Sequence, residues 1–329
     1  LATTALATSG MYEITAATTL PTLVLNTDDT ILVAYQDTTV KIAKVMANGS
    51  GLNTSANGAV TFGTAGILDT GITPSSATAI RIAIDASNQV IVASSVSGNS
   101  VSVNRYSANG GTTFFNGGSS VVKNITGLGS AGVVLRSLMI DTLNQILLFG
   151  DNTSGANGRI FSCRLNAVGT LDIAWNSVPT SPDVAGIHTF SLDGSTNVYG
   201  TSIFINGDIY LAGAAGSTVP LVMCMYGDSY ITQVAQQPLQ VGAGILDTTL
   251  DTLTPGLLTL NLNNYLSTLN LTGSTSKLLH LYADGSMLFA FNKGFTTIVA
   301  KMNSAFQVDT TLNTTGYVTI VNTPTVNDM

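Results

Sequence analysis

The stretch that decides the fold is IAIDASNQVIVAS, residues 82–94, which is followed after a short gap by VSVNRYSANG, residues 101–110. Val and Ile alternate with smaller or polar residues in both stretches, as is typical of β-strands. Asp, Asn, Ser and Gly lie between and after the apolar runs, and these residues favour turns. The sequence therefore predicts three antiparallel strands joined by short turns between residues 82 and 110.

The same pattern recurs along the chain. Its strand–turn–strand part occurs as LVLNTDDTILVAY (23–35), IAIDASNQVIVAS (82–94), LMIDTLNQILLFG (138–150), IFINGDIYLAG (203–213) and HLYADGSMLFAF (280–291). A third strand follows at 41–49, 101–110, 159–169, 220–228 and 297–305. The first apolar residues after the turns are Ile31, Val90, Ile146, Ile209 and Met287, at intervals of 59, 56, 63 and 78 residues. Four strands with their turns need about 40 to 65 residues, so each unit has the size of one propeller blade.

These repeats predict an all-β protein, a β-propeller of five blades with four antiparallel strands each, over residues 20–321. A unit of this size cannot cover both faces of its sheet alone, and stacking units face to face in a ring covers them. Residues 1–19 form an N-terminal segment, in which MYEIT (11–15) is a candidate ring-closing strand beside GYVTIV (316–321), and residues 322–329 form a C-terminal tail. Six blades or a β-solenoid are the alternatives.

The composition supports the all-β prediction and excludes several classes of function. Only 9% of the residues are charged, whereas about 25% is usual, and this excludes coiled coils and charge-rich disordered chains. Seventeen of the 18 acids are Asp, which favours turns, and Glu13 is the only Glu. With 11 Lys and Arg and a net charge of −7, the chain is not expected to bind nucleic acid.

An uncharged stretch at residues 209–227 raises the question of a membrane span. Gly, Ser, Thr and Pro interrupt it, so we expect two strands, IYLAG and PLVMCMY, and no membrane span. The chain starts with LATTALATSG, which suggests a processed product or a piece of a longer protein. The polar, Lys-poor composition favours an extracellular or cell-surface location.

A cation recurs at one register of the third strand, at Lys44, Arg105, Arg164 and Lys301, and Met225 breaks the series. The turn, the V/I-V-A strand, the A-R/K-Y/M-N-A-x-G strand and a following L-D/N-T together resemble the bacterial delta-60 repeat. The last element occurs as LNTS (52–55), LDIAW (171–175) and VDTT (308–311). This resemblance implies a β-propeller of the kind found in large exported or surface-associated bacterial proteins, and it implies no catalytic residues.

The repeated cations have two interpretations. They could form a ring that binds an anion, or each could pair with the downstream acid or Asn of its own blade, such as Asp172 or Asp309. We favour the second interpretation because repetition within blades normally serves packing.

A second set of residues lies where the first strand of each unit begins, which in propellers lies at one mouth of the central channel. These candidate ligand-binding residues are Arg81, Arg136, Lys277 and Tyr199. Converging cations in such a funnel would attract carboxylates or sulfated and uronic sugars. Arg81 is offset by one residue from Arg136 and Lys277, and a one-residue shift reverses the face of a strand.

The remaining reactive residues give weaker signals. Cys163 and Cys224 occupy equivalent positions in successive units, so we expect two free, buried thiols. His188 and His280 show no metal-site spacing, and we expect neither a metal nor a cofactor. The acidic turns at 26–30 and 246–254 are interpreted as solvated turns and not calcium loops. The aromatic residues near unit junctions are expected to pack between blades; they are Phe114, Phe115, Trp175, Tyr226 and Tyr230.

These observations predict a non-catalytic recognition or scaffold module that binds a protein or glycan partner. One alternative is a structural subunit of a surface or particle assembly, which binds copies of itself. The other is a glycosidase or polysaccharide lyase at the channel mouth, against which stand the single Glu and the two His.

Overall fold

The computed structural model describes residues 21–47, 51–54, 61–75, 80–111, 115, 121–124, 132–152, 160–175, 184–190, 196–197, 202–205, 208–215, 219–225, 260–261, 271, 275–282, 284–293, 295–305 and 307–321. These residues form strands, turns and connecting segments, and within them no helix is long and apolar enough to cross a bilayer.

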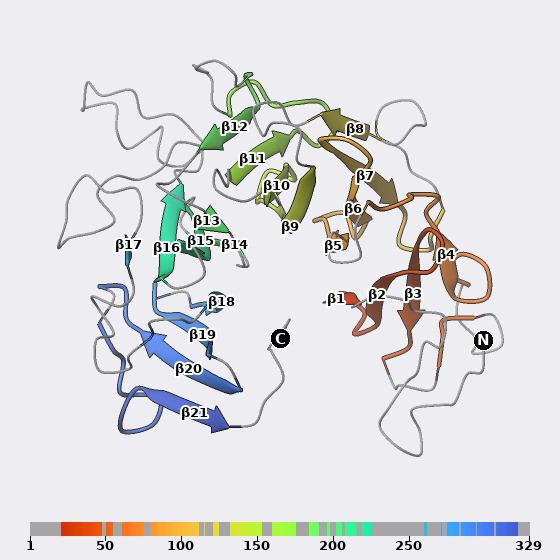
Figure 1. Cartoon of the computed structure of the whole chain (residues 1–329). Coiled ribbons are helices and arrows are strands. Elements are labelled where there is room, and N and C mark those ends of the chain that lie inside the picture. Colours follow the sequence, from red (N-terminus) through yellow and green to blue (C-terminus); the bar gives the residue numbers. More distant parts are fainter. Residues whose placement is uncertain are drawn as a thin grey trace. The chain divides into compact units, whose positions relative to one another are not determined.

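The strands assemble into consecutive sheets (Figure 1). The first sheet contains β1 (Thr22–Leu25), β2 (Ile31–Gln36), β3 (Val40–Val45) and β4 (Ile67–Asp69). The second contains β5 (Ile80–Ile84), β6 (Val90–Val96), β7 (Ser100–Tyr106) and β8 (Val121–Asn124). The third contains β9 (Val133–Ile140), β10 (Ile146–Asn152), β11 (Ile160–Leu165) and β12 (Ile187–Phe190).

The last two sheets follow the same order along the chain. The fourth contains β13 (Thr196–Asn197), β14 (Ser202–Ile205), β15 (Asp208–Ala215), β16 (Val219–Met225) and β17 (Leu260–Asn261). The fifth contains β18 (Thr275–Leu281), β19 (Met287–Lys293), β20 (Thr296–Met302) and β21 (Tyr317–Val321). In the first, second and fifth sheets, sequence neighbours pair antiparallel throughout, which is the meander of a propeller blade.

The predicted fold class is confirmed: the chain is an all-β protein of the β-propeller class, and its described residues form five blade-like sheets. The predicted strand–turn–strand stretches overlap the first two strands of the first, second, third and fifth sheets, and β14 and β15 of the fourth. The uncharged window at 209–227 forms the hairpin β15–β16, as predicted. The fourth sheet departs from the four-strand pattern, because two short pieces, β13 and β14, both pair with β15 where the other sheets have one strand. MYEIT and the segments 1–19 and 322–329 lie outside the described residues.

Two compact units divide these sheets. The first unit holds the first two sheets, β9, the start of β10 and the turn Leu165–Thr170. The second holds the rest of β10 and β11, β12 and the last two sheets. Within the first unit, β1 contacts β5 and β5 contacts β9, so the first strands of successive sheets are neighbours. This is the packing expected of inner strands in adjacent blades.

One five-residue turn recurs between strands. In the turn from β5 to β6, Asp85 N–H donates to Gln89 O and Asn88 N–H donates to Asp85 O. Asn88 has a φ of 60°, a left-handed conformation that Asn tolerates better than most residues. The Asp85 carboxylate accepts the N–H groups of Ser87 and Gln89. Asp141 begins the equivalent turn from β9 to β10 in the same way.

The core of the first unit lies between its first two sheets. One cluster joins Leu32 and Ile42 of the first sheet to Ile82 and Val92 of the second. The second strand of the second sheet, β6, is buried along almost its whole length, so both of its faces are covered. This explains why β6 begins with the continuous apolar run Val90–Ala93 and does not alternate with polar residues there.

Candidate functional site

Each of the four repeated cations has a carboxylate partner. The side-chain distances are 3.0 Å for Lys44–Asp28, 3.8 Å for Arg105–Asp85, 2.6 Å for Arg164–Asp172 and 2.8 Å for Lys301–Asp309. The cations lie near the ends of β3, β7, β11 and β20. Their positive charges are therefore compensated inside their own sheets, as the pairing interpretation requires.

The predicted partner is correct in two sheets and wrong in the other two. Arg164 and Lys301 pair with the downstream Asp172 and Asp309, as predicted. Lys44 pairs instead with Asp28, in the turn that precedes its strand. The downstream position holds Asn53 here, and a neutral amide cannot balance an ammonium group.

Arg105 also pairs upstream, with Asp85 of the turn before β6. Downstream of Arg105, the Phe115 ring lies 4.3 Å from the guanidinium carbon. Arg105 Nη2 donates to Ala167 O at 2.5 Å, which links it to the turn after β11. Burial lowers the pKa of Arg105, and Asp85 acts against this shift.

A common main-chain frame surrounds three of these cations. The N–H groups of Asn53, Asp172 and Asp309 donate to the carbonyl oxygens of Lys44, Arg164 and Lys301, at 2.8, 3.0 and 2.9 Å. The main-chain N–H groups of Lys44, Arg164 and Lys301 donate in turn to the carbonyl oxygens of Gly66, Gly186 and Gly316, at 3.0, 3.2 and 3.1 Å. The L-D/N element of the repeat thus closes a main-chain loop around the cation.

Steric crowding explains why a glycine occupies this position of the frame. Gly316 has a φ of 75°, and a Cβ atom there would come within 2.2 Å of Val308 Cγ1. A Cβ at Gly66 would come within 2.6 Å of Leu52 Cβ. Leu52 and Val308 directly precede the Asn53 and Asp309 of the frame, so the apolar residue of the L-D/N element packs under the glycine.

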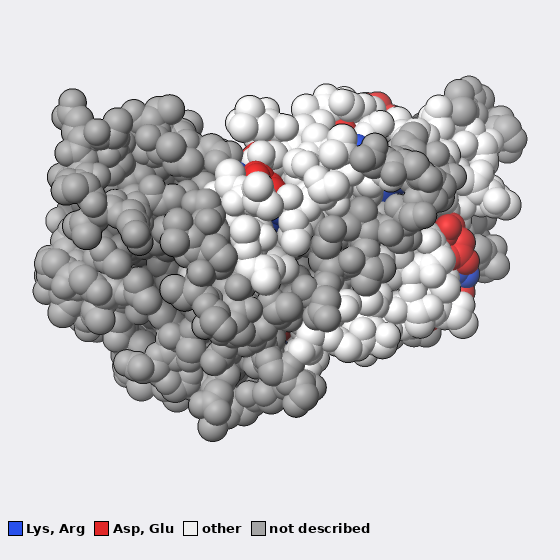
Figure 2. All heavy atoms as spheres, turned by 90° about the horizontal axis from the view of Figure 1, so that it is seen from above, with Lys and Arg blue, Asp and Glu red and all other residues white. Residues whose placement is uncertain are grey.

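Aromatic rings complete the surroundings of the cations. The Arg164 guanidinium lies 4.9 Å from the Trp175 ring, and Lys301 Nζ lies 5.1 Å from the Tyr282 ring. Trp175 and Phe115 are buried, which confirms that these two junction aromatics pack internally. Phe114, Tyr226 and Tyr230 lie outside the described residues. In Figure 2 only small areas of Lys and Arg are visible on the described part of the face in view.

The structure brings two of the candidate ligand-binding residues together. Arg81 lies on β5 and Arg136 on β9, and both side chains are partly buried. Arg81 Nε donates to Arg136 O, and Arg81 Nη1 donates to Ile80 O, both at 2.6 Å. The Arg81 guanidinium therefore ties β5 to β9, whatever else it binds.

For the candidate Lys277 the structure gives the strand pairing, which can be compared with that of Arg81. Arg81 pairs with Ala93, and Lys277 pairs with Ala290, which are the fourth residues of β6 and β19. A β-bulge between Leu278 and His280 produces this match, so the predicted one-residue offset between Arg81 and Lys277 does not exist in the strand pairing. Tyr199 lies outside the described residues. The ligand-binding role of all four stays a prediction.

Cys163, Cys224 and His280 lie on β11, β16 and β18. Cys163 is buried and forms no disulfide, as predicted. Cys224 of β16 lies opposite Tyr210 of β15 in the strand pairing. His280 is exposed, and its ring meets the Tyr282 ring edge-on at 4.5 Å. Within the described part of the chain, no group of three His, Cys, Asp or Glu side chains could hold a metal ion.

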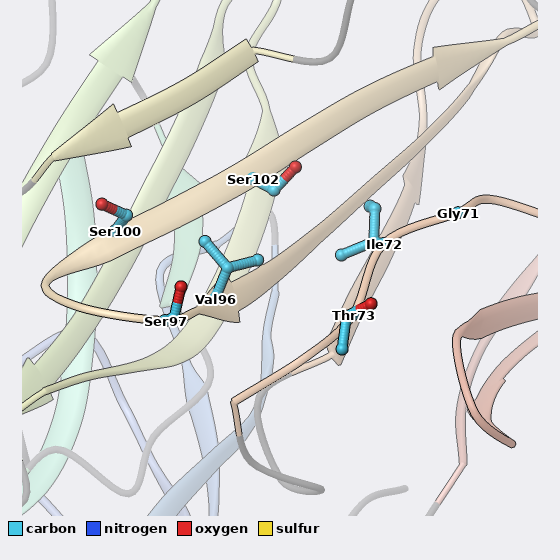
Figure 3. Close-up of a pocket in the computed structure, with 7 residues that line it drawn as sticks. All are labelled: Gly71, Ile72, Thr73, Val96, Ser97, Ser100 and Ser102. Atoms are coloured by element: carbon cyan, nitrogen blue, oxygen red, sulfur yellow. The ribbon is translucent and has the colours of Figure 1, made fainter.

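A pocket of about 400 Å³, which none of the sequence patterns predicted, lies in the first unit (Figure 3). One wall is the connection from β4 to β5, and the other is the β6–β7 hairpin. The lining residues are Gly71, Ile72, Thr73, Val96, Ser97, Ser100 and Ser102.

The pocket combines hydroxyl groups with two apolar side chains. Thr73 and Ser97 are exposed at its rim, whereas Ile72 and Ser102 are buried. Hydrogen bonds fix the connecting wall, because Val40 N–H donates to Ile72 O and Ser75 N–H donates to Ser95 O, each at 2.8 Å. A hydroxyl both donates and accepts a hydrogen bond, so the site suits an uncharged ligand that carries several polar groups.

No protein-family model matches the sequence, and no curated protein matches it either. Among solved structures, the chain is similar to the Aleuria aurantia lectin at 12% identity, over 91% of this chain and 77% of that chain, with a TM-score of 0.47. It is similar to the SapL1 lectin at 11% identity, over 96% and 86%, with a TM-score of 0.44. The polysaccharide lyase Uly1 matches at 8% identity, over 94% and 74%, with a TM-score of 0.45. Similarity at this level identifies neither a ligand nor an activity for this chain.

Proposed function

We propose that this chain is a β-propeller recognition module that binds an uncharged glycan in the pocket between the β4–β5 connection and the β6–β7 hairpin. The observation that carries the proposal is the lining, which combines four hydroxyl side chains with the aliphatic side chains of Ile72 and Val96. A sugar ring presents hydroxyl groups at its edge and C–H groups on its faces. The serine and threonine hydroxyls would form hydrogen bonds with the sugar hydroxyls, and the two aliphatic side chains would contact the C–H faces of the ring.

The proposal assigns the repeated cations to the scaffold. Lys44, Arg105, Arg164 and Lys301 lie beside carboxylates of their own sheets, and this supports a structural role for each cation within its own sheet. Membership of the delta-60 repeat family and an extracellular or cell-surface location are part of the same proposal. The recurrence of the L-D/N element in the main-chain frame supports the first, and the composition supports the second.

A glycan array followed by calorimetry tests the proposal. We expect an uncharged glycan to bind, and we expect Ser102→Ala to weaken its binding by about five- to tenfold, since a lost hydrogen bond costs about 1 to 1.5 kcal/mol. Thr73→Val should act in the same direction at the rim. Thr310→Val is the matched control, because Thr310 is exposed and is not among the lining residues. Binding that both pocket variants leave unchanged would contradict the proposal.

The same array separates this pocket from the predicted cationic site. A ligand of Arg81, Arg136 and Lys277 would carry carboxylate or sulfate groups, and its affinity would fall as salt is added. A ligand of the hydroxyl-lined pocket would bind almost independently of salt. Selective, salt-sensitive binding of acidic glycans that Arg136→Ala abolishes would transfer the function to the cationic site.

A further inference from the structure

Thr70 attaches the connecting wall of the pocket to the first sheet. It directly follows β4, and its N–H and its Oγ1 both donate to Val40 O of β3, at 3.0 and 2.7 Å. The same hydroxyl oxygen accepts the N–H of Ile72 at 3.2 Å, and Ile72 lines the pocket. The Thr70 hydroxyl therefore links the pocket wall to β3 through two hydrogen bonds.

The carbonyl group of Thr70 attaches the same wall to the second sheet. Thr70 O accepts hydrogen bonds from Asn104 Nδ2 at 3.3 Å and from Tyr106 OH at 3.1 Å. Asn104 Nδ2 also donates to Tyr106 OH at 2.8 Å, and both residues are buried on β7. They share one face of β7 with Ser102, which lines the opposite wall of the pocket. Thr70 is thus bonded to both of the sheets that supply the pocket walls.

A second attachment holds the connecting wall beyond the pocket. Ser75 N–H donates to Ser95 O of β6 at 2.8 Å, so the lining residues Gly71–Thr73 lie between two fixed points, Thr70 and Ser75. A wall held at both ends moves outward only if it breaks hydrogen bonds. The pocket volume of about 400 Å³ is near the lower end of the roughly 300 to 1,000 Å³ of ligand pockets. A narrow pocket with fixed walls favours a small, unsubstituted group.

We propose that Thr70 is a positioning residue that fixes the width of the pocket, so that the site selects the unsubstituted terminal sugar of an uncharged glycan and rejects the same sugar with a bulky substituent. This inference rests on the proposed function, because it concerns the selectivity of the same pocket. A fixed wall excludes an oversized group sterically, whereas a wall that moves admits it. Loosening the attachment at Thr70 should therefore change the ratio of the affinities for two ligands, and loss of overall stability would not.

Pairs of uncharged disaccharides that differ by one O-acetyl group on the terminal sugar test this proposal by calorimetry. We expect the wild type to bind the unacetylated member more tightly. Thr70→Val keeps the shape of the side chain but removes both hydrogen bonds of the hydroxyl, and it should reduce this preference by about threefold or more. Thr70→Ser keeps the hydroxyl and should retain the preference of the wild type. Tyr106→Phe should act like Thr70→Val but more weakly, because Asn104 still donates to Thr70 O.

Thr297→Val is the matched control. It removes a buried, hydrogen-bonded hydroxyl from the fifth sheet, which belongs to the other compact unit. It should lower the free energy of unfolding without changing the preference between the two disaccharides.

Hydrogen exchange without any glycan separates a failure of this inference from a failure of the proposed function. We expect Thr70→Val to speed the exchange of the Ser75 N–H by about threefold or more, since the wall then opens more often. A wild type that binds no glycan would overturn the proposed function and the selectivity with it, whatever the exchange rate. A wild type that binds, but whose preference or exchange rate Thr70→Val leaves unchanged, would overturn the positioning role alone.

Discussion

The third and fifth sheets build the same main-chain frame around a cation but bury it to different extents. Asp172 N–H donates to Arg164 O at 3.0 Å, and Asp309 N–H donates to Lys301 O at 2.9 Å. The side chains of Arg164 and Asp172 are 3% and 15% exposed, whereas those of Lys301 and Asp309 are 19% and 16% exposed. Similar backbone geometry therefore holds a buried ion pair in one sheet and a more accessible one in the other.

The first sheet shows which part of this arrangement is constant. Asn53 N–H donates to Lys44 O within the same frame, yet the Lys44 ammonium pairs with Asp28 from another turn. Three parts are constant: the cationic residue, the glycine whose carbonyl oxygen accepts its main-chain N–H, and the Asp or Asn whose N–H donates to its carbonyl oxygen. The countercharge is supplied by whichever acid lies close enough, and its energetic importance should follow the burial of the pair.

The buried pair should give the largest effect. Asp172→Ala leaves the Arg164 guanidinium without its carboxylate, and removing one partner of a buried pair costs about 3 to 5 kcal/mol. We expect a loss of this size in the free energy of unfolding, measured by urea denaturation.

A double variant separates the lost charge from the lost side-chain volume. Arg164→Met combined with Asp172→Ala removes the unbalanced cation, and it should be more stable than Asp172→Ala alone, because replacing both members of a buried pair by apolar groups is often nearly neutral. A double variant less stable than the single one would show that packing against Trp175, and not charge, dominates this sheet.

The first sheet tests whether the countercharge can be moved. Burial acts to raise the pKa of Asp28, but the hydrogen bonds from Thr30 and Lys44 together outweigh it, so the pKa lies below its usual value. The Asp28 side chain is 47% exposed but the Lys44 side chain only 6%, so Asp28→Ala should cost about 1.5 to 3 kcal/mol, the value of a hydrogen bond to a charged group. Asn53→Asp in the Asp28→Ala background should restore part of this loss, since Asn53 has the frame position of Asp172. Asn53→Asp alone, with Asp28 still present, is the control and should bring no gain in the free energy of unfolding.

The repeated elements of the fold could be predicted because local chemistry determines them. Asp85 and Asp141 start turns whose fourth residues, Asn88 and Asn144, have a positive φ, and the apolar runs on either side pair as the turn requires. The break of the inner strand of the fourth sheet into β13 and β14 could not be predicted from this pattern. It depends on how each piece aligns with β15 and not on a repeated residue.

The candidate sites were less predictable because they depend on contacts between distant residues. The bond from Arg81 to Arg136 O spans 55 residues, and the bulge that aligns Lys277 with Ala290 leaves no distinctive residue in the sequence. The pocket did leave a signal. Ser100 and Ser102 are two residues apart on β7, so they share one face of a largely buried strand. Hydroxyl groups repeated on such a face indicate a candidate ligand site.

The accessible pair of the fifth sheet should have the smallest effect, and this effect should depend on pH. The hydrogen bond from Lys301, with further hydrogen bonds from Thr311, lowers the pKa of Asp309 from 3.8 to about 2. A carboxyl group whose pKa is lower in the folded state stabilises the fold above its unfolded pKa, and this contribution is lost as the pH falls through the folded value. The difference in free energy of unfolding between wild type and Asp309→Asn should therefore be constant above about pH 5 and shrink between about pH 4 and pH 2. Asp29→Asn is a suitable control, because Asp29 lies in an exposed turn of the first sheet. A difference that stays constant down to pH 2 would show that the Lys301–Asp309 contact contributes no charge-dependent stability.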